Sequence, residues 1–152
     1  MTRGPLVPAL LGLLVAATAV AAEPEKGARL GTTLDEISAA LAADGYALTG
    51  FERDDGRLGL TIVREDRRIE AHVDPATGEV TRVESRTRGG PWPLPGVDDA
   101  ELRARLAAEG YEIVKYERER GGVEVGAMRD GRRWELRIDP RDGRVVTVEE
   151  DE

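Results

Sequence analysis

The side chains that could carry out catalysis are few in this chain of 152 residues. Cysteine is absent, which excludes thiolate catalysis, disulfides, cysteine-ligated zinc and a lipid-modified cysteine. The only histidine is His72, between Ala71 and Val73 on an expected strand, so we expect it to face solvent. A Ser-His-Asp mechanism needs a base held beside its nucleophile, and nothing in the sequence supplies one. We therefore predict that the protein is not an enzyme and has no catalytic residue.

Carboxylates are plentiful and could serve glycosidase or calcium chemistry instead. The best candidate clusters are Asp54 with Asp55 and Asp139 with Asp142. A calcium loop of the EF-hand type needs alternating oxygen ligands that end in a glutamate, and neither cluster has that spacing. The Asp-Pro-x-x-Gly segments at residues 74–78 and 139–143 instead fit tight turns. We predict no metal site and no cofactor.

The net charge argues against several classes of partner. The chain has 30 acidic and 22 basic residues, a net charge of −8. Removal of an N-terminal leader containing Arg3 would leave 21 basic residues and a charge of −9. Nucleic acids and anionic lipid surfaces select basic proteins, so we predict neither as a partner. The acidity has two readings, which are solubility and a preference for basic partners.

The N-terminus has the pattern of a secretory signal peptide, which we assign to residues 1–22. Arg3 precedes an apolar stretch from Leu6 to Val20, and the alanines up to Ala22 fit signal peptidase cleavage at Ala21 or Ala22. An uncleaved anchor is the alternative, because the stretch approaches the ~20 residues of a membrane span. Two prolines at its start and the acidic segment after it favour cleavage. We expect a periplasmic or secreted protein without stable membrane insertion.

The remainder of the chain repeats itself with a shift of 65 residues. Residues 35–84 align with residues 100–149 without a gap, and 20 of these 50 pairs are identical. Such a repeat defines the unit of the fold. We place the two repeats at residues 30–86 and 98–150, with a linker rich in proline and glycine at 87–97.

Each repeat reads as one helix followed by strands. Thr33 and Asp98 are helix N-caps, and Gly45 and Gly110 end the helices. Turn signals then separate about four segments with alternating apolar residues. We expect the polar side of the second helix, with Arg103, to face solvent. The predicted class is α+β, with each helix packed on an antiparallel meander, and whether the repeats share one sheet stays open.

The order of these signals resembles the PepSY family. The resemblance rests on a helix ending in Gly-Tyr, a Glu-rich strand, a glycine hairpin and an Asp-Pro-x-x-Gly turn, all present twice. PepSY domains occur in propeptides of secreted metallopeptidases and in exported bacterial envelope proteins, and the family is associated with restraining peptidases. The resemblance therefore implies an exported, non-enzymatic binding module that restrains or inhibits a peptidase. The alternative is a structural or sensory envelope module that binds a protein assembly or a polymer.

Two kinds of segment are candidates for partner contacts. The hairpin tips carry exposed charges, and the linker contains a tryptophan that either seals the seam between the repeats or anchors a partner. The predicted contact residues are Asp54, Asp55, Trp92, Glu119 and Arg120. A further set of charges recurs in both copies, Glu52-Arg53 and Glu117-Arg118 among them. They read either as charge pairs on the solvent face or as a recognition surface.

Overall fold

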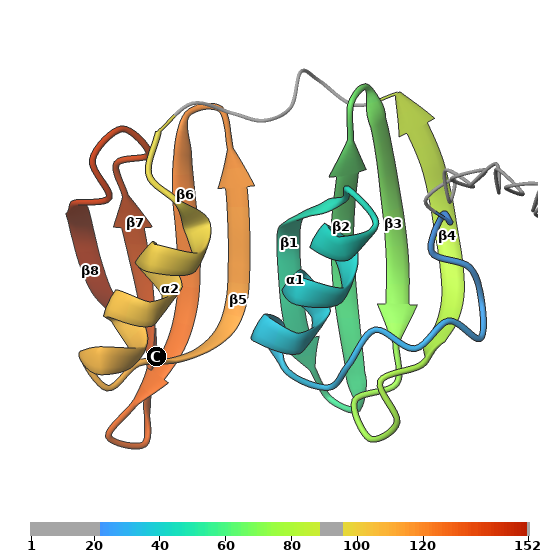
Figure 1. Ribbon diagram of the computed structural model, residues 1–152. Coiled ribbons are helices and arrows are strands. Elements are labelled where there is room, and N and C mark those ends of the chain that lie inside the picture. The colour runs from blue at the N-terminus through green and yellow to red at the C-terminus, as the bar shows by residue number, and fades with distance from the viewer. Residues whose placement is uncertain (1–21, 89–95, 152) are drawn as a thin grey trace, which may run out of the picture.

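The computed structural model describes residues 22–88 and 96–151, and its elements follow the predicted repeat (Figure 1). The predicted α+β class is confirmed. The first repeat consists of α1 (Leu34–Ala43), β1 (Ala47–Asp54), β2 (Arg57–Arg64), β3 (Arg67–Val73) and β4 (Val80–Arg88). The second consists of α2 (Asp99–Ala108), β5 (Glu112–Glu119), β6 (Gly122–Arg129), β7 (Arg132–Ile138) and β8 (Val145–Asp151).

The helices begin at the predicted caps. The amide of Glu36 donates to Thr33 Oγ1 at 3.2 Å, and the amide of Thr33 donates to Glu36 Oε2 at 3.2 Å. Backbone hydrogen bonds from Thr32 and Thr33 hold the pKa of the Glu36 carboxyl below its usual range. The amide of Glu101 donates to Asp98 Oδ1 at 2.9 Å. Among the described residues, neither helix has the length and apolarity that a membrane span requires.

The two repeats share one antiparallel sheet, which answers the question that the sequence left open. Its strand order is β4-β3-β2-β1-β5-β6-β7-β8, so the first strand of each repeat lies at the centre. The join between β1 and β5 comprises three residue pairs, Gly50 with Glu117, Phe51 with Tyr116 and Glu52 with Lys115. The pairing of β1 with β5 is therefore shorter than that of β1 with β2, which extends over seven residue pairs.

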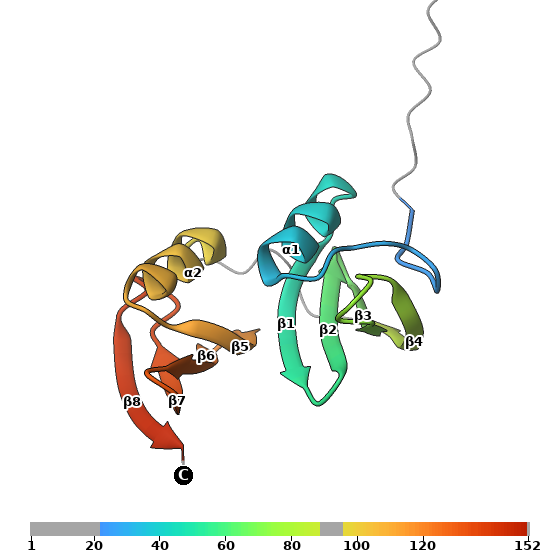
Figure 2. The ribbon, with the colours of Figure 1, turned by 90° about the horizontal axis from the view of Figure 1, so that it is seen from below.

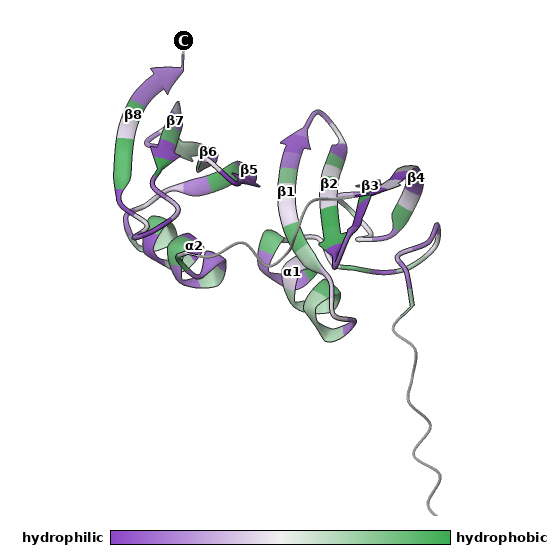
Figure 3. Cartoon of the chain, turned by 90° about the horizontal axis from the view of Figure 1, so that it is seen from above, coloured by the Kyte–Doolittle hydropathy of each residue, from purple (hydrophilic) through white to green (hydrophobic). Residues whose placement is uncertain are grey.

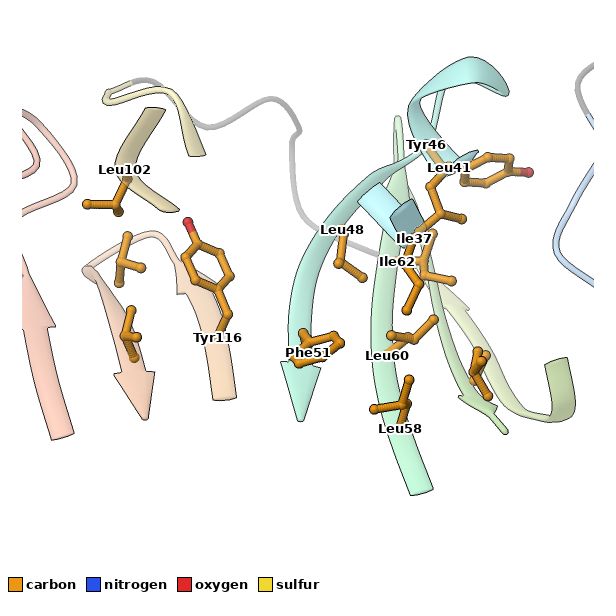
Figure 4. Close-up of a cluster of buried hydrophobic side chains, with 14 of the residues drawn as sticks. Ile37, Leu41, Tyr46, Leu48, Phe51, Leu58, Leu60, Ile62, Leu102 and Tyr116 are labelled. Carbon is orange, nitrogen blue, oxygen red and sulfur yellow. The ribbon is translucent and has the colours of Figure 1, made fainter. Parts of the chain in front are cut away.

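Both helices cover the same face of this sheet (Figure 2). The strands contribute alternate residues to that face, and side chains from both repeats form one connected hydrophobic cluster. Figure 4 shows part of it, with Ile37 and Leu41 of α1 above Leu60 and Ile62 of β2. Phe51 and Tyr116, opposite each other across the join, are 3% and 1% exposed, so the cluster continues through the seam.

The strands at the two ends of the sheet are longer than predicted. The linker was placed at 87–97, but β4 continues to Arg88, because Thr87 and Arg88 pair with Arg68 and Arg67. Residues 89–95 lie outside the described residues. In the second repeat β8 reaches Asp151, which pairs with Arg133 and forms an ion pair with it at 3.1 Å. In both cases the partner strand supports the pairing for longer than the local composition suggested.

A segment before α1 adds to the first repeat. The amide of Gly27 donates to the carbonyl of Val80 at 2.8 Å, and the amide of Val80 donates to the carbonyl of Ala28 at 2.8 Å. Glu23 forms an ion pair with Arg86 of β4 at 3.2 Å and another with Arg67. This segment therefore covers the outer side of β4 at its start.

Candidate functional site

Two of the predicted contact residues, Glu119 and Arg120, lie at the tip of the hairpin between β5 and β6. Both are exposed. A side chain built at the neighbouring Gly121 would meet no atom within 4 Å, so the tip stands clear of the rest of the protein. Among the described residues neither Glu119 nor Arg120 forms an ion pair, which leaves one carboxylate and one guanidinium available to a partner.

A concavity of about 710 Å³ lies beside this tip, and we call it the basin. It is bounded by the β5–β6 hairpin, the turn between β7 and β8, and the start of β8. Its charged lining residues are Glu117, Glu119, Arg120, Glu124, Arg137, Asp139 and Arg141. Its apolar lining residues are Val123, Ile138, Pro140 and Val146. Val123 and Ile138 belong to the core, so Val146 and Pro140 supply the accessible apolar surface of the basin beside charges of both signs.

The charges of the basin are not equally available. Arg141 is engaged by Asp139, with Nε 3.0 Å from Oδ1 and Nη2 2.6 Å from Oδ2. These hydrogen bonds from Arg141 lower the pKa of Asp139 to about 2. Arg137 is held more loosely, since its Nε lies 3.9 Å from Glu124 Oε1 and its side chain is 66% exposed. Among the described residues Glu117, Glu119 and Arg120 form no ion pair, and Arg137 is only loosely held, so these are the basin charges most available to a partner.

The matching hairpin of the first repeat differs. Asp54 and Asp55 lie at the tip between β1 and β2, and the amide of Asp55 donates to Asp54 Oδ1 at 2.8 Å, so Asp54 supports the turn. Asp55, His72 and Ala76 stand where the second repeat has its three basin arginines. The structure does not bring Asp54 or Asp55 into the basin. Trp92, the remaining predicted contact, lies outside the described residues.

His72 is less exposed than predicted. Its side chain is 27% exposed, and Nε2 lies 3.1 Å from Glu84 Oε1 on the neighbouring strand. Nδ1 is buried without a hydrogen-bond partner among the described residues. In the part of the chain that the structure describes, no three histidine, aspartate or glutamate side chains gather closely enough to hold a metal ion.

A polar network in the second repeat is the feature that sequence reasoning missed. Arg118 was expected on the solvent face, but its side chain is 2% exposed. Its Nη1 lies 2.7 Å from Asp99 Oδ1 and donates to the carbonyl of Val97 at 3.1 Å. The hydroxyl of Tyr116 donates to the same Asp99 carboxylate. Burial, together with the charge of Asp99, raises the pKa of Tyr116 well above its usual range, so this phenol stays protonated.

Arg103 extends this network to the first repeat. The sequence placed it toward solvent, but it is 7% exposed because it lies between the two helices. Its Nη2 donates to Ser38 Oγ at 3.2 Å, and its Nε lies 3.6 Å from Asp35 Oδ1. Its guanidinium lies 5.7 Å from the centre of the Tyr116 ring. Arg103 thus connects α2 to α1 and helps to fix the two repeats relative to each other.

A difference between the copies signalled this network. The first repeat has Leu34, Ser38 and Phe51 where the second has Asp99, Arg103 and Tyr116. The sequence alone does not connect these three positions. The changes acquire meaning once α2 is packed against the seam.

The comparisons with known proteins identify the family. The family model described as peptidase propeptide and YPEB domain matches residues 6–84 and 96–149. The chain belongs to this family, the PepSY family. The two matched segments cover most of the two PepSY repeats of the structure, in agreement with the resemblance seen in the sequence.

Two solved structures are similar to this PepSY chain. A predicted lipoprotein of Clostridium difficile 630 is 12% identical, with a TM-score of 0.43 over 72% of this chain and 86% of that chain. The C-terminal domain of YpeB from Bacillus megaterium is also 12% identical, with a TM-score of 0.34 over 86% of this chain and 70% of that chain. Comparison with curated proteins gives no match.

Proposed function

We propose that this PepSY protein is exported, acts without catalysis, and restrains a peptidase by binding to it. The leader pattern of residues 1–22 supports export. The family's connection with peptidase propeptides supports a peptidase as the partner. Since fold alone does not fix function, the proposal depends on the surface of the second repeat.

The observation that carries the proposal is the exposed hairpin tip beside the basin. Glu119 and Arg120 are exposed and make no ion pair with described residues, so a partner can use both charges without displacing an internal partner. The adjoining basin offers the exposed Val146 and the half-buried Pro140 as apolar contacts. In this proposal the tip enters the cleft of the peptidase and blocks substrate access sterically.

An inhibition assay tests the proposal. The purified protein, at micromolar concentrations, is added to a panel of secreted metallopeptidases, and hydrolysis of a peptide substrate is followed. We expect at least one peptidase to be slowed. The double variant E119R/R120E exchanges the two tip charges at constant net charge, and we expect it to lose inhibition because both charges then face the wrong partner groups.

A matched control makes the assay specific. The variant D66R/R88D exchanges an exposed ion pair of 3.3 Å in the first repeat, far along the sheet from the basin. It is expected to inhibit as the wild type does. If no peptidase is bound or slowed, or if both exchanges act equally, the proposal fails. Capture of an envelope scaffold or polymer as the main partner would support the structural or sensory role instead.

A further inference from the structure

The last strand, β8, is an open edge of the sheet. It lies at the end of the strand order, with β7 as its single neighbour among the described strands. The two large apolar side chains that are exposed among the described residues both belong to it, Val146 at 64% and Val148 at 46%. Val146 lines the basin, whereas Val148 is paired with the core residue Leu136. Exposed apolar side chains therefore lie on both faces of the sheet at this edge.

The strand at the opposite edge of the sheet, β4, has backbone hydrogen-bond partners on its outer side, which β8 does not have among the described residues. Val80, the first residue of β4, is bonded on its outer side by the backbone of Gly27 and Ala28. Its counterpart in the second repeat is Val145, the first residue of β8. No described segment pairs with the outer side of β8. An open edge of this kind is a template for another strand.

The charges along β8 determine which strand fits. Arg144 precedes the strand, and Glu149, Glu150 and Asp151 end it, a change from hydrophobic to hydrophilic residues that Figure 3 shows. Glu150 and Asp151 are engaged by arginines of β7 at 3.1 Å. Among the described residues Glu149 has no ion pair, and it stands opposite Glu135. The edge is therefore basic at one end, acidic at the other and apolar between.

We propose that β8 pairs with β8 of a second copy of this chain, antiparallel about a twofold axis. This arrangement brings the basic start of each strand beside the acidic end of the other, and the apolar centres meet. A parallel arrangement would place like charges together, which is unfavourable. Such an interface uses the same patch on both copies and closes after two.

The dimer would also complete the basin. Because Val146 lines the basin at the open edge, the strand of the second copy forms the wall that each copy lacks on that side. The inference shares Val146 with the peptidase proposal but is tested separately, since it concerns the strand edge and not the charges of the hairpin tip.

Sedimentation velocity between about 1 and 200 µM tests this inference, because weak homodimers dissociate over such a range. We expect a dimer whose population rises with concentration. R144E and E149R should each raise the dissociation constant about tenfold, because each places like charges at both ends of the twofold interface. The double variant R144E/E149R exchanges the charges and should restore the dimer.

Controls separate the interface from the fold. Circular dichroism confirms that each variant is folded, and E149R removes the contact between Glu149 and Glu135, so it is not expected to unfold β8. R82E, on the opposite edge, should leave the dimer unchanged. A monomer at every concentration overturns the proposal, as do a dimer that ignores the β8 charge reversals, a double variant that stays dissociated, and a dimer that R82E dissociates.

Discussion

The two copies of the repeat allow the same interaction to be compared in a buried and in an exposed setting. Arg118 and Arg53 occupy matching positions, and each donates to a backbone carbonyl 21 residues earlier, at 3.1 Å and 2.8 Å. Arg118 is buried and engages Asp99, whereas Arg53 is exposed. Replacing each arginine by methionine keeps most of the side-chain volume. The pair R118M and R53M therefore isolates the effect of burial on the same interaction.

The expected free energies differ by more than the error of the measurement. Removal of one partner of a buried ion pair costs about 3–5 kcal/mol. Asp99 is 21% exposed and keeps the hydroxyl of Tyr116, which reduces our expectation for R118M to about 2–3 kcal/mol. R53M loses one exposed hydrogen bond, for which we expect about 0.5–1 kcal/mol.

Urea unfolding measures both values. With a slope of about 1.5 kcal/mol per molar, R118M should lower the midpoint by about 1.3–2 M and R53M by less than about 0.7 M. A triple variant, D99L/Y116F/R118M, removes all three polar groups together and should unfold within about 1 kcal/mol of the wild type. Equal losses in the two single variants would refute the reasoning, because burial would then not set the cost.

Three further predictions follow from local geometry and titration. A Cβ at Gly50 would lie 2.8 Å from a threonine side chain on β2, so G50A should lower the free energy of unfolding by about 1–3 kcal/mol. At Gly59 the atom nearest to a Cβ would be 3.9 Å away, so G59A should raise the free energy of unfolding by up to about 1 kcal/mol. Urea unfolding measures both changes. A stabilised G50A or a strongly destabilised G59A would contradict this. Because burial raises the pKa of Tyr116 above its ordinary value of 10, its contribution to stability is complete below pH 10 and is lost at higher pH. Phenolate absorbance should show that Tyr116 ionises only as the protein unfolds, so the wild type and Y116F should coincide before alkaline unfolding; an earlier difference would count against its burial. The pKa of Asp139 is lowered to about 2 from 3.8, so its contribution is present above pH 3.8 and lost as the pH falls toward 2. R141A should reduce the fall of the urea midpoint at acidic pH. If the midpoint of R141A falls at acidic pH as that of the wild type does, the contact with Arg141 is not the cause of the acid sensitivity.

The local elements could be predicted because their causes are local. The capping box of Thr33 and Glu36 involves residues three apart, and Gly45 and Gly110 supply the positive φ of 76° and 87° after each helix. The hairpin tip with Glu119 was found for the same reason. Its neighbourhood could not be, since the basin also requires the β7–β8 turn, about 20 residues further along the chain.

The errors concern residues whose surroundings come from distant parts of the chain. Arg103 and Arg118 stand at positions that read as polar and solvent-facing. Arg118 is buried because Asp99 and Val97, 19 and 21 residues away, fold over it. For Arg103 the partner is Ser38, 65 residues away in the other copy. A periodic pattern predicts which side of a helix or strand a residue lies on, but it does not predict which other element packs against that side.

By itself the sequence determined the repeating unit of this protein, because helix caps, turns and the alternation of apolar and polar residues depend on side chains a few residues apart. It also determined the family, since those signals recur in both copies. The tertiary structure decided that β1 pairs with β5, and with it the single sheet, the position of β8 as an open edge and the buried network at the seam. Strand edges pair through backbone groups that every residue carries, so two equivalent repeats contain no local signal for which edges meet.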